Sequence, residues 1–381
     1  MIDEGPVLVT GATGFIGGFI TAELLRRGVR VIAPVRPGGG RSPRDRAAAL
    51  LEFFGLPPDS PLEAVEGFVD RPGLGLARPA ARRIRNEVGT VMHCAADTSF
   101  AARRRDRVHR VNVRGLENVF HSVGDCRRFW HMSTAYSVGS RPGTYAEELR
   151  PAREFNNQYE RSKHLAERRI TELCRETSTR LMILRPSVVY GDSGTGASLS
   201  FNALYYAVRT LLFIRDTMLR DIRERGGDRA RRLGVSAEAD GRTRMPVSLP
   251  GGGELNVIPV DYLVGSVMAL AEADGEGIYH IVSRRPSSVS ALIGYIETCF
   301  GIYGLEVSDD YRRSEGGLQT MVNGYMELYY PYFCDGRTFE DTRARSVLDP
   351  AGITCPELSL PVFRRCMEYA VGQDWGAGQR I

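Results

Sequence analysis

Thr10-Gly11-Ala12-Thr13-Gly14-Phe15-Ile16-Gly17 is the stretch that decides the fold of this 381-residue chain. It follows a short apolar run at 6–10 and opens a stretch of helical periodicity at 15–27. Between a strand and a helix, such glycines allow a tight turn, a close approach of backbone N–H groups to a pyrophosphate, and close packing of the helix on the strand. The motif therefore predicts a dinucleotide site; an ordinary glycine-rich turn is the alternative. The expected contacts are Thr10, Gly11, Thr13, Gly14, Phe15, Ile16 and Gly17.

The alternation of apolar runs and helical stretches continues to about residue 190, which is typical of a parallel sheet wrapped by helices. The expected strands are 6–10, 29–35, 63–68, 89–95, 127–133 and 180–185, and the expected helices are 15–27, 43–54, 78–88, 105–123 and 155–176. A strand–helix–strand pattern returns at 256–282. The pattern predicts an α/β protein with a Rossmann-type, doubly wound parallel sheet and a smaller, interleaved C-terminal substrate domain.

The composition changes after residue 190, and this change sets the expected domain boundaries. The predicted nucleotide-binding domain covers 1–190 and is completed by about 256–282. The predicted substrate-binding part covers 191–255 and 283–381, and it includes an aromatic loop at 325–333. The chain shows no internal repeat, so we expect two joined domains and no repeat array.

Charge and cysteine usage exclude several classes of protein. The net charge is +4, from 50 basic and 46 acidic residues, which is not the one-sided basic field of a dedicated nucleic-acid-binding protein. The seven cysteines form no C-x-x-C pair, which argues against a disulfide framework or a zinc site, and we expect no metal. The N-terminus lacks the pattern of an export leader, and no apolar run reaches the roughly 18 residues of a membrane span. We therefore expect a cytoplasmic protein.

Lys163 is the only lysine among the 50 basic residues. Arginine can replace lysine on most solvated surfaces, but not where a compact ammonium must fit a tight site. Tyr159 precedes Lys163 by four residues in a predicted helix, so both lie on one face. The ammonium is expected to stabilise the phenolate and to lower the phenol pKa from its usual value of about 10. Tyr159 is thus the predicted proton donor to a carbonyl oxygen, and Lys163 has further donors for a ribose hydroxyl.

Two hydroxyl residues stand at the end of the predicted strand at 127–133. Ser133 and Thr134 stand at the carboxyl edge of the sheet, where ligands of open α/β folds bind. Either hydroxyl can donate a hydrogen bond to the same carbonyl oxygen as Tyr159 and stabilise an oxyanion, whereas a plain cap of the strand end is the alternative. The predicted catalytic group is Thr134, Tyr159 and Lys163.

The second predicted strand ends in Arg36, where enzymes selective for NAD place an acid that holds the ribose. An arginine can instead make charge-assisted hydrogen bonds to the 2′-phosphate of NADP. Arg46, with Arg41 or Arg44, can join it, although a solvated cluster of arginines is the alternative. We therefore predict NADP(H) as the cofactor, with Arg36 and Arg46 among its contacts.

The fourth predicted strand ends in small side chains that leave room for a cofactor. Cys94, Ala95 and Ala96 are the expected contacts there, with Cys94 as a small apolar residue and not a nucleophile. The chain contains no G-x-S-x-G motif and no close pair of histidine ligands, so hydrolase and metalloenzyme functions lack support.

Together these residues resemble the extended short-chain dehydrogenase/reductase superfamily from residue 6 to about 285. The segments 93–98, 133–136, 185–189 and 258–262 are most similar to its male-sterility branch, which comprises fatty acyl-CoA reductases and thioester reductase domains. The resemblance implies that NADPH reduces an acyl thioester to an aldehyde, in some members onward to the alcohol, with Thr134, Tyr159 and Lys163 as catalytic residues. It also implies cofactor contacts from Tyr159, Lys163, Pro186, Ser187 and Val188.

The implied substrate is an acyl chain carried by coenzyme A or by an acidic carrier protein. Three other functions stay open at this point. The first is a ketone or aldehyde reductase, and the second is a nucleotide-sugar epimerase or dehydratase on the same scaffold. The third is a regulator that senses NADP without turnover.

The amphipathic stretch at 201–225 has two interpretations. Its apolar residues form one helical stripe, while Arg209, Arg220 and Arg223 face away from it. The stripe can pack on the protein's own core or on a second copy in a homodimer. Alternatively, this helix and the arginine-rich stretch at 215–232 form a lid over the acyl site, and their cations meet an acidic carrier protein or the phosphates of coenzyme A.

Overall fold

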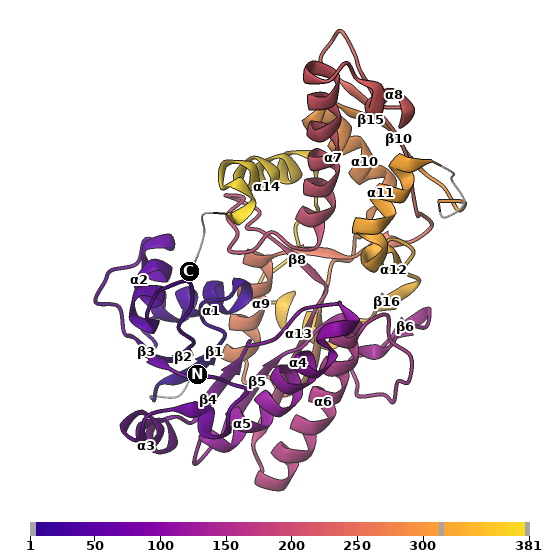
Figure 1. Cartoon of the computed structure of the whole chain (residues 1–381). Helices are drawn as coiled ribbons and strands as arrows, with labels where there is room; N and C mark the ends of the chain where they lie inside the picture. Colours follow the sequence, from indigo (N-terminus) through magenta and orange to yellow (C-terminus); the bar gives the residue numbers. More distant parts are fainter. Residues whose placement is uncertain (1–4, 312–315, 378–381) are drawn as a thin grey trace.

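A parallel sheet of seven strands forms the centre of the larger domain in the computed structural model, which describes residues 5–311 and 316–377 (Figure 1). The strand order is β13-β7-β5-β4-β1-β2-β3. Strands β2 and β3 therefore lie on one side of β1, and β4, β5, β7 and β13 lie on the other side. The strands are β1 (Val7–Thr10), β2 (Val31–Val35), β3 (Leu62–Glu66), β4 (Thr90–His93), β5 (Arg128–Met132), β7 (Arg180–Pro186) and β13 (Gly277–Ile281). This order confirms the predicted doubly wound Rossmann-type fold.

Helices cover both faces of this sheet, because its central strands are buried on both sides and carry apolar residues in succession. One face packs against α1 (Phe15–Arg26), α2 (Pro43–Phe53) and α9 (Val260–Glu272). The other face packs against α3 (Arg78–Glu87), α5 (Gly115–Ser122) and α6 (Gln158–Thr177). Each of these helices except α9 was expected from periodicity in its own segment, and α9 completes the strand–helix–strand pattern at 256–282.

The helix predicted at 105–123 is not one regular α-helix. It consists of α4 (Arg105–His109), a π-helical turn (η3, Arg110–Arg114) and α5. The turn surrounds Asn112, whose buried side chain donates to the Asp97 carbonyl at 3.0 Å and to Ser162 Oγ at 2.8 Å. A π-helical turn is a local feature that apolar periodicity does not reveal, and such turns are frequent at functional sites.

The smaller domain has its own core at the end of the molecule away from the large sheet (Figure 1). Its elements are α7 (Leu204–Glu224), α8 (Asp228–Arg232), β9 (Ser236–Ala237), β10 (Thr243–Leu249), α10 (Val289–Phe300), β15 (Ile302–Val307), α11 (Gly317–Met326), α12 (Tyr330–Phe333) and α14 (Leu360–Gly372). The three strands form a second sheet in the order β15-β10-β9. The segment expected as an aromatic loop at 325–333 is instead helical, and its residues Met326, Tyr330 and Tyr332 are buried in the core of the smaller domain.

Short strand pairs lie outside the two larger sheets, and the two domains are interleaved in sequence. They are β8 (Val188–Tyr190) with β12 (Val257–Pro259), β6 (Gly143–Tyr145) with β16 (Arg337–Phe339), and β11 (Glu254–Leu255) with β14 (Ser287–Ser288). Helix α13 (Thr342–Leu348) buries Ala344 and Leu348 in the core beneath α9. Part of the segment 283–381, expected as substrate-binding, therefore packs with the nucleotide-binding sheet.

The apolar stripe of α7 is buried in the core of the smaller domain. Tyr205, Val208, Leu211, Ile214 and Met218 all belong to that core, as the packing interpretation of this helix expects. The C-terminal end of α7 meets α8 at the end of the molecule farthest from the large sheet (Figure 1). The arginine-rich part of the predicted lid therefore lies away from the sheet edge, and only the N-terminal half of α7 approaches it.

Candidate active site

The glycine-rich loop packs its backbone directly against the end of β4. Gly11 has a φ of +72°, and a Cβ on it would lie 2.8 Å from the Ala95 backbone nitrogen. Thr10 holds the same segment, since its carbonyl accepts from the Cys94 N–H at 3.1 Å and its hydroxyl accepts from the Ala95 N–H at 3.3 Å. No side chain caps the N-terminus of α1, so its first N–H groups are available to a phosphate. The fold thus brings the loop together with Cys94 and Ala95.

The buried side chains beneath this loop are held in neutral forms. Burial raises the pKa of the Cys94 thiol to about 12, which leaves it protonated and a poor nucleophile. Burial, with a smaller effect of Lys163, lowers the pKa of His93 to about 3. Its Nδ1 lies 2.8 Å from the Thr10 hydroxyl. Both side chains are therefore uncharged at neutral pH.

Two arginines meet at the end of β2 beside the loop. Arg46, from α2, donates from Nη1 to the Arg36 carbonyl at 2.6 Å and from Nη2 to the Thr13 hydroxyl at 2.7 Å. Burial and the neighbouring Arg36 charge lower the pKa of the Arg46 guanidinium. The Arg36 side chain is exposed. A pair of cations therefore stands at the strand end where NAD-selective enzymes carry an acid.

Thr134 and Ser133 have different surroundings. The Thr134 hydroxyl makes only long hydrogen bonds, to the Pro186 carbonyl at 3.5 Å and from the Tyr136 N–H at 3.4 Å. The Ser133 hydroxyl donates instead to Glu167, a buried carboxylate on α6. Of the two hydroxyls considered from the sequence, Thr134 is the one that a ligand can engage at little cost.

Lys163 is buried and donates from Nζ to the Met132 carbonyl at 2.7 Å. Burial lowers its pKa to about 8, although Cys94 and Glu167 partly oppose this effect. The ammonium therefore persists at neutral pH. Its other donors point to no described residue, which leaves them for a ligand.

Tyr159 differs from the expectation that Lys163 would lower its pKa. Burial, and then the charge of Glu160, raise the pKa of the Tyr159 phenol above its usual value. Lys163 does not offset this because its ammonium is turned toward the Met132 carbonyl. Within the described residues, the Tyr159 hydroxyl makes no hydrogen bond. The group is therefore a protonated phenol available to a ligand.

A series of ring contacts that includes both domains begins at Tyr159. Phe100 lies 6.1 Å from the Tyr159 ring, and it also contacts Tyr329 at 5.5 Å and Tyr332 at 5.6 Å. Tyr206 of α7 stacks on Tyr329 at 5.1 Å. We call Phe100, Tyr206, Tyr329 and Tyr332 the aromatic wall. It connects the phenol of Tyr159 to the N-terminal half of α7.

Two buried carboxylates fix α6, and the sequence did not single them out. Glu160 accepts from Tyr332 Oη at 2.8 Å and pairs with Arg337 of β16 at 3.5 Å. Glu167 pairs with Arg185 of β7 at 2.6 Å, and both side chains are fully buried. The hydrogen bonds and charge of Arg185, with Ser133 and Ser137, outweigh burial and hold the pKa of Glu167 below its usual value. These pairs anchor the helix that carries Tyr159 and Lys163.

Asn112 is a third residue that sequence reasoning missed. It lies four residues from each of the buried residues Val108 and Leu116, on the same face of the helical segment. A polar residue on an apolar helical face could have identified Asn112 from the sequence. Its hydrogen bond to Ser162 ties the π-helical turn to α6. Asn112 therefore helps to position α6.

The residues at the end of β7 complete a surface that fits a dinucleotide. Ser187 donates its backbone N–H to the Ile281 carbonyl at 3.1 Å, and Val188 donates to the Asn256 carbonyl at 3.2 Å. The Ser187 hydroxyl is buried and has no hydrogen-bond partner in the part of the chain that the structure describes. A bound cofactor would give the Ser187 hydroxyl a hydrogen-bond partner. The close packing of Gly11 against the end of β4 holds the loop at the strand-end edge where dinucleotides bind.

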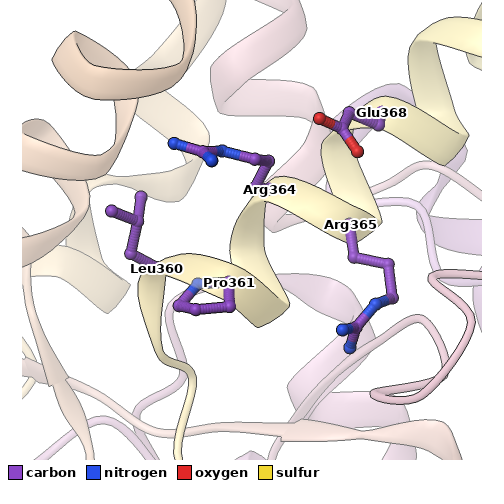
Figure 2. Close-up of a pocket in the computed structure, with 5 residues that line it drawn as sticks. All are labelled: Leu360, Pro361, Arg364, Arg365 and Glu368. Atoms are coloured by element: carbon purple, nitrogen blue, oxygen red, sulfur yellow. The ribbon is translucent and has the colours of Figure 1, made fainter.

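Other candidate sites give no competing centre. A cavity of 270 Å³ lies at the start of α14, where Arg364 and Arg365 leave opposite sides of the helix (Figure 2). It contains none of the residues predicted from the sequence, and Arg365 already donates to the Ser193 carbonyl. Over residues 5–311 and 316–377, no group of His, Cys, Asp and Glu is arranged to hold a metal ion. None of the helices in these same segments is long and apolar enough to span a membrane.

Curated relatives match only part of this chain. The nonribosomal peptide synthetase cpsA of Aspergillus campestris is 26% identical over 287 residues, which are 70% of this chain and 24% of that protein. The human fatty acyl-CoA reductase 1 is 31% identical over 149 residues, which are 35% of this chain and 29% of that protein. The chain thus spans less than a third of the length of these relatives.

Solved structures share the whole fold. The terminal R domain from the myxalamid PKS-NRPS pathway superposes with a TM-score of 0.77 at 20% identity, covering 98% of this chain and 92% of that one. The UDP-glucuronic acid 4-epimerase of Bacillus cereus, solved with NAD, gives 0.64 at 16% identity, covering 98% and 100%. The sequence profile of the Male sterility protein family matches residues 9–267. The chain therefore belongs to the Male sterility protein family, on the fold of the extended short-chain dehydrogenase/reductases.

Proposed function

We propose that this chain is a reductase that uses NADPH to reduce an acyl thioester to an aldehyde. The observation that carries the proposal is the Tyr159 phenol, which makes no hydrogen bond within the described residues. It shares α6 with the buried Lys163 ammonium, and the loosely bonded Thr134 hydroxyl follows β5. Relatives named as fatty acyl-CoA reductases and peptide synthetases support the thioester as substrate. Reduction onward to the alcohol stays an alternative within the same chemistry.

The chain's own residues would bind and polarise the thioester carbonyl. When bound, NADPH supplies the hydride. Tyr159 and Thr134 would donate hydrogen bonds to the carbonyl oxygen, which gains negative charge as the carbon becomes tetrahedral. Collapse of this oxyanion expels the thiolate and leaves the aldehyde. Protein dipoles fixed by the Glu160 and Glu167 ion pairs need little reorganisation during this step.

The protonation states suit reduction at neutral pH. The raised pKa keeps the Tyr159 phenol protonated, as a hydrogen-bond donor must be. The Lys163 pKa of about 8 keeps the ammonium charged, so it can bind a ribose hydroxyl and stabilise negative charge nearby. Thr134 can turn from the Pro186 carbonyl at little cost, because that hydrogen bond is 3.5 Å long.

The preference for NADPH is expected to depend on Arg36. NADPH should bind at least about tenfold more tightly than NADH, because Arg36 and Arg46 offer charge-assisted hydrogen bonds to the 2′-phosphate. Arg36→Ala should remove most of that difference in a fluorescence titration. Arg30→Ala is the matched control, since Arg30 precedes the opposite end of β2 and pairs with Glu87. Equal affinities for the two cofactors in the parent protein would contradict the assignment.

We further propose that the N-terminal half of α7 borders the acyl group through the aromatic wall. The contacts from Tyr159 through Phe100 and Tyr329 to Tyr206 support this part of the lid hypothesis. Stacked aromatic rings offer an apolar surface to an acyl chain. The arginines at the other end of α7 have no such connection to the site.

Replacing Arg220, Arg223 and Arg225 together with glutamine should therefore leave kcat/KM unchanged for both coenzyme A and pantetheine thioesters. These residues belong to the end of α7 that meets α8, away from Tyr159. The measurement is NADPH oxidation with both substrates at low salt, where charge effects are largest. A loss of kcat/KM confined to the coenzyme A substrate would instead support the hypothesis that these arginines belong to a lid over the acyl site.

One assay separates the proposed function from its alternatives. NADPH oxidation is measured against acyl-coenzyme A, acyl-carrier-protein and free aldehydes of matched chain length, and the products are identified by chromatography. Aldehyde formation from a thioester supports the proposal. Activity on free ketones or aldehydes alone would indicate a carbonyl reductase, and tightly retained NAD with turnover of nucleotide sugars would indicate an epimerase.

A further inference from the structure

A groove of 460 Å³ lies between the α4–η3 segment and α6, on the outer side of the catalytic helix. Its lining contains four arginines: Arg105, Arg110 and Arg114 from the first segment, and Arg161 from α6. Asp106 is the only carboxylate in that lining. We call this feature the arginine groove.

The positive charge of the arginine groove is largely uncompensated. Arg105, Arg114 and Arg161 form no ion pair with any residue in 5–311 or 316–377, and Arg110 reaches Asp70 at 3.4 Å. Arg169, farther along the same helix, is by contrast paired with Glu117 at 2.5 Å. Guanidinium groups gathered without carboxylates repel one another, and a bound anion relieves that repulsion.

The groove adjoins the catalytic residues through α6. Arg105 begins α4 and Gln158 begins α6, and these two helices contact each other. Gln158, Arg161 and Ser162 line the groove, while Tyr159 and Lys163 occupy the other side of the same helical turns.

A second copy of the chain is a poor occupant of this groove. A two-fold contact places the same surface of both subunits face to face, so four arginines would oppose four arginines. Like charges in such a contact are unfavourable. The arrangement instead suits phosphate, because planar guanidinium groups bind phosphate oxygens with paired hydrogen bonds.

We infer that the arginine groove binds the phosphate end of the pantetheine arm that carries the acyl thioester. This inference rests on the proposed function. Coenzyme A and a carrier protein both present a 4′-phosphate on a flexible pantetheine arm, and the phosphate is remote from the reacting carbonyl. Binding that remote group holds the thioester near Tyr159 and contributes to kcat/KM without touching the chemistry.

Direct titration tests the groove without turnover. Coenzyme A, 4′-phosphopantetheine and pantetheine are titrated calorimetrically into the full chain, saturated with NADP⁺ so that adenosine phosphates cannot enter the dinucleotide site. Arg105→Gln, Arg114→Gln and Arg161→Gln are combined in one variant, and the Arg220, Arg223 and Arg225 glutamine triple is the matched control. Circular dichroism and NADP⁺ affinity show that each variant is folded.

The groove variant is expected to bind coenzyme A at least about tenfold more weakly, whereas the control binds like the parent. Added salt should weaken the parent's binding, and pantetheine should bind poorly throughout. Coenzyme A bound much more tightly than 4′-phosphopantetheine indicates a coenzyme A site. Equal affinities for coenzyme A and 4′-phosphopantetheine indicate that the pantetheine arm is presented by a carrier protein.

Three results would overturn the inference: unchanged affinity in the groove variant, equal loss in the α7 control, or no binding of either phosphorylated probe by the parent. The proposed function fails separately. If the groove binds coenzyme A but the protein reduces no thioester, the groove stands and the reductase assignment does not. If thioesters are reduced but the groove variant keeps the parent's affinity and kcat/KM, the reductase assignment stands and the role of the groove is wrong.

Discussion

Tyr159→Phe is expected to bind NADPH like the parent protein and to turn over at least about 10²-fold more slowly. The substitution removes only the hydroxyl, which makes no hydrogen bond within the described residues and so contributes little to folding. The ring contact with Phe100 at 6.1 Å is retained. Stopped-flow measurement of NADPH oxidation gives the rate of reduction, and fluorescence titration gives the cofactor affinity.

Tyr303→Phe is the control for this experiment. Tyr303 lies in β15 of the smaller domain, and its hydroxyl donates to Glu238 at 2.7 Å on the surface. Losing that hydroxyl should leave turnover unchanged. Turnover of Tyr159→Phe close to that of the parent would contradict the role of the phenol, whatever the substrate proves to be.

Lys163→Arg is expected to lower kcat/KM by about 10²-fold, because the buried site accommodates a compact ammonium and not a planar guanidinium. Lys163 is nearly fully buried and donates to the Met132 carbonyl at 2.7 Å, so a longer side chain has no room to keep that geometry. Arg168→Lys makes the opposite exchange on the exposed side of the same helix, and it should leave activity unchanged.

The same lysine predicts the pH dependence of reduction. Burial lowers the pKa of Lys163 to about 8, so the charged form is present below that pH and is lost above it. The parent's kcat/KM should therefore fall as the pH rises through about 8. Because an arginine stays charged, Lys163→Arg should show a low but flat profile in this range. If kcat/KM falls above about pH 8 in the same way in the parent and in Lys163→Arg, the titration belongs to another group.

Much of the site could be predicted because its parts are local in sequence. Gly11 is needed where β1 meets α1, and Tyr159 and Lys163 share a face because they are four residues apart in one helix. Parallel strands bring their carboxyl ends to one edge, so Thr10, Ala95 and Thr134 were expected to lie near one another. Periodicity of 2 and 3.6 residues contains this information without any knowledge of long-range contacts.

The sequence by itself therefore determined the sheet, the dinucleotide loop, the family and the identity of the candidate catalytic residues. Only the tertiary structure decided how those residues are held and charged. The Glu160–Arg337 pair joins segments 177 residues apart. Burial and the charge of Glu160 raise the pKa of Tyr159, and the ammonium of Lys163 does not lower it. Likewise, the arginine groove exists only because α4 and α6 lie side by side. Burial and charge depend on which distant segments pack together, and no local pattern of residues specifies that.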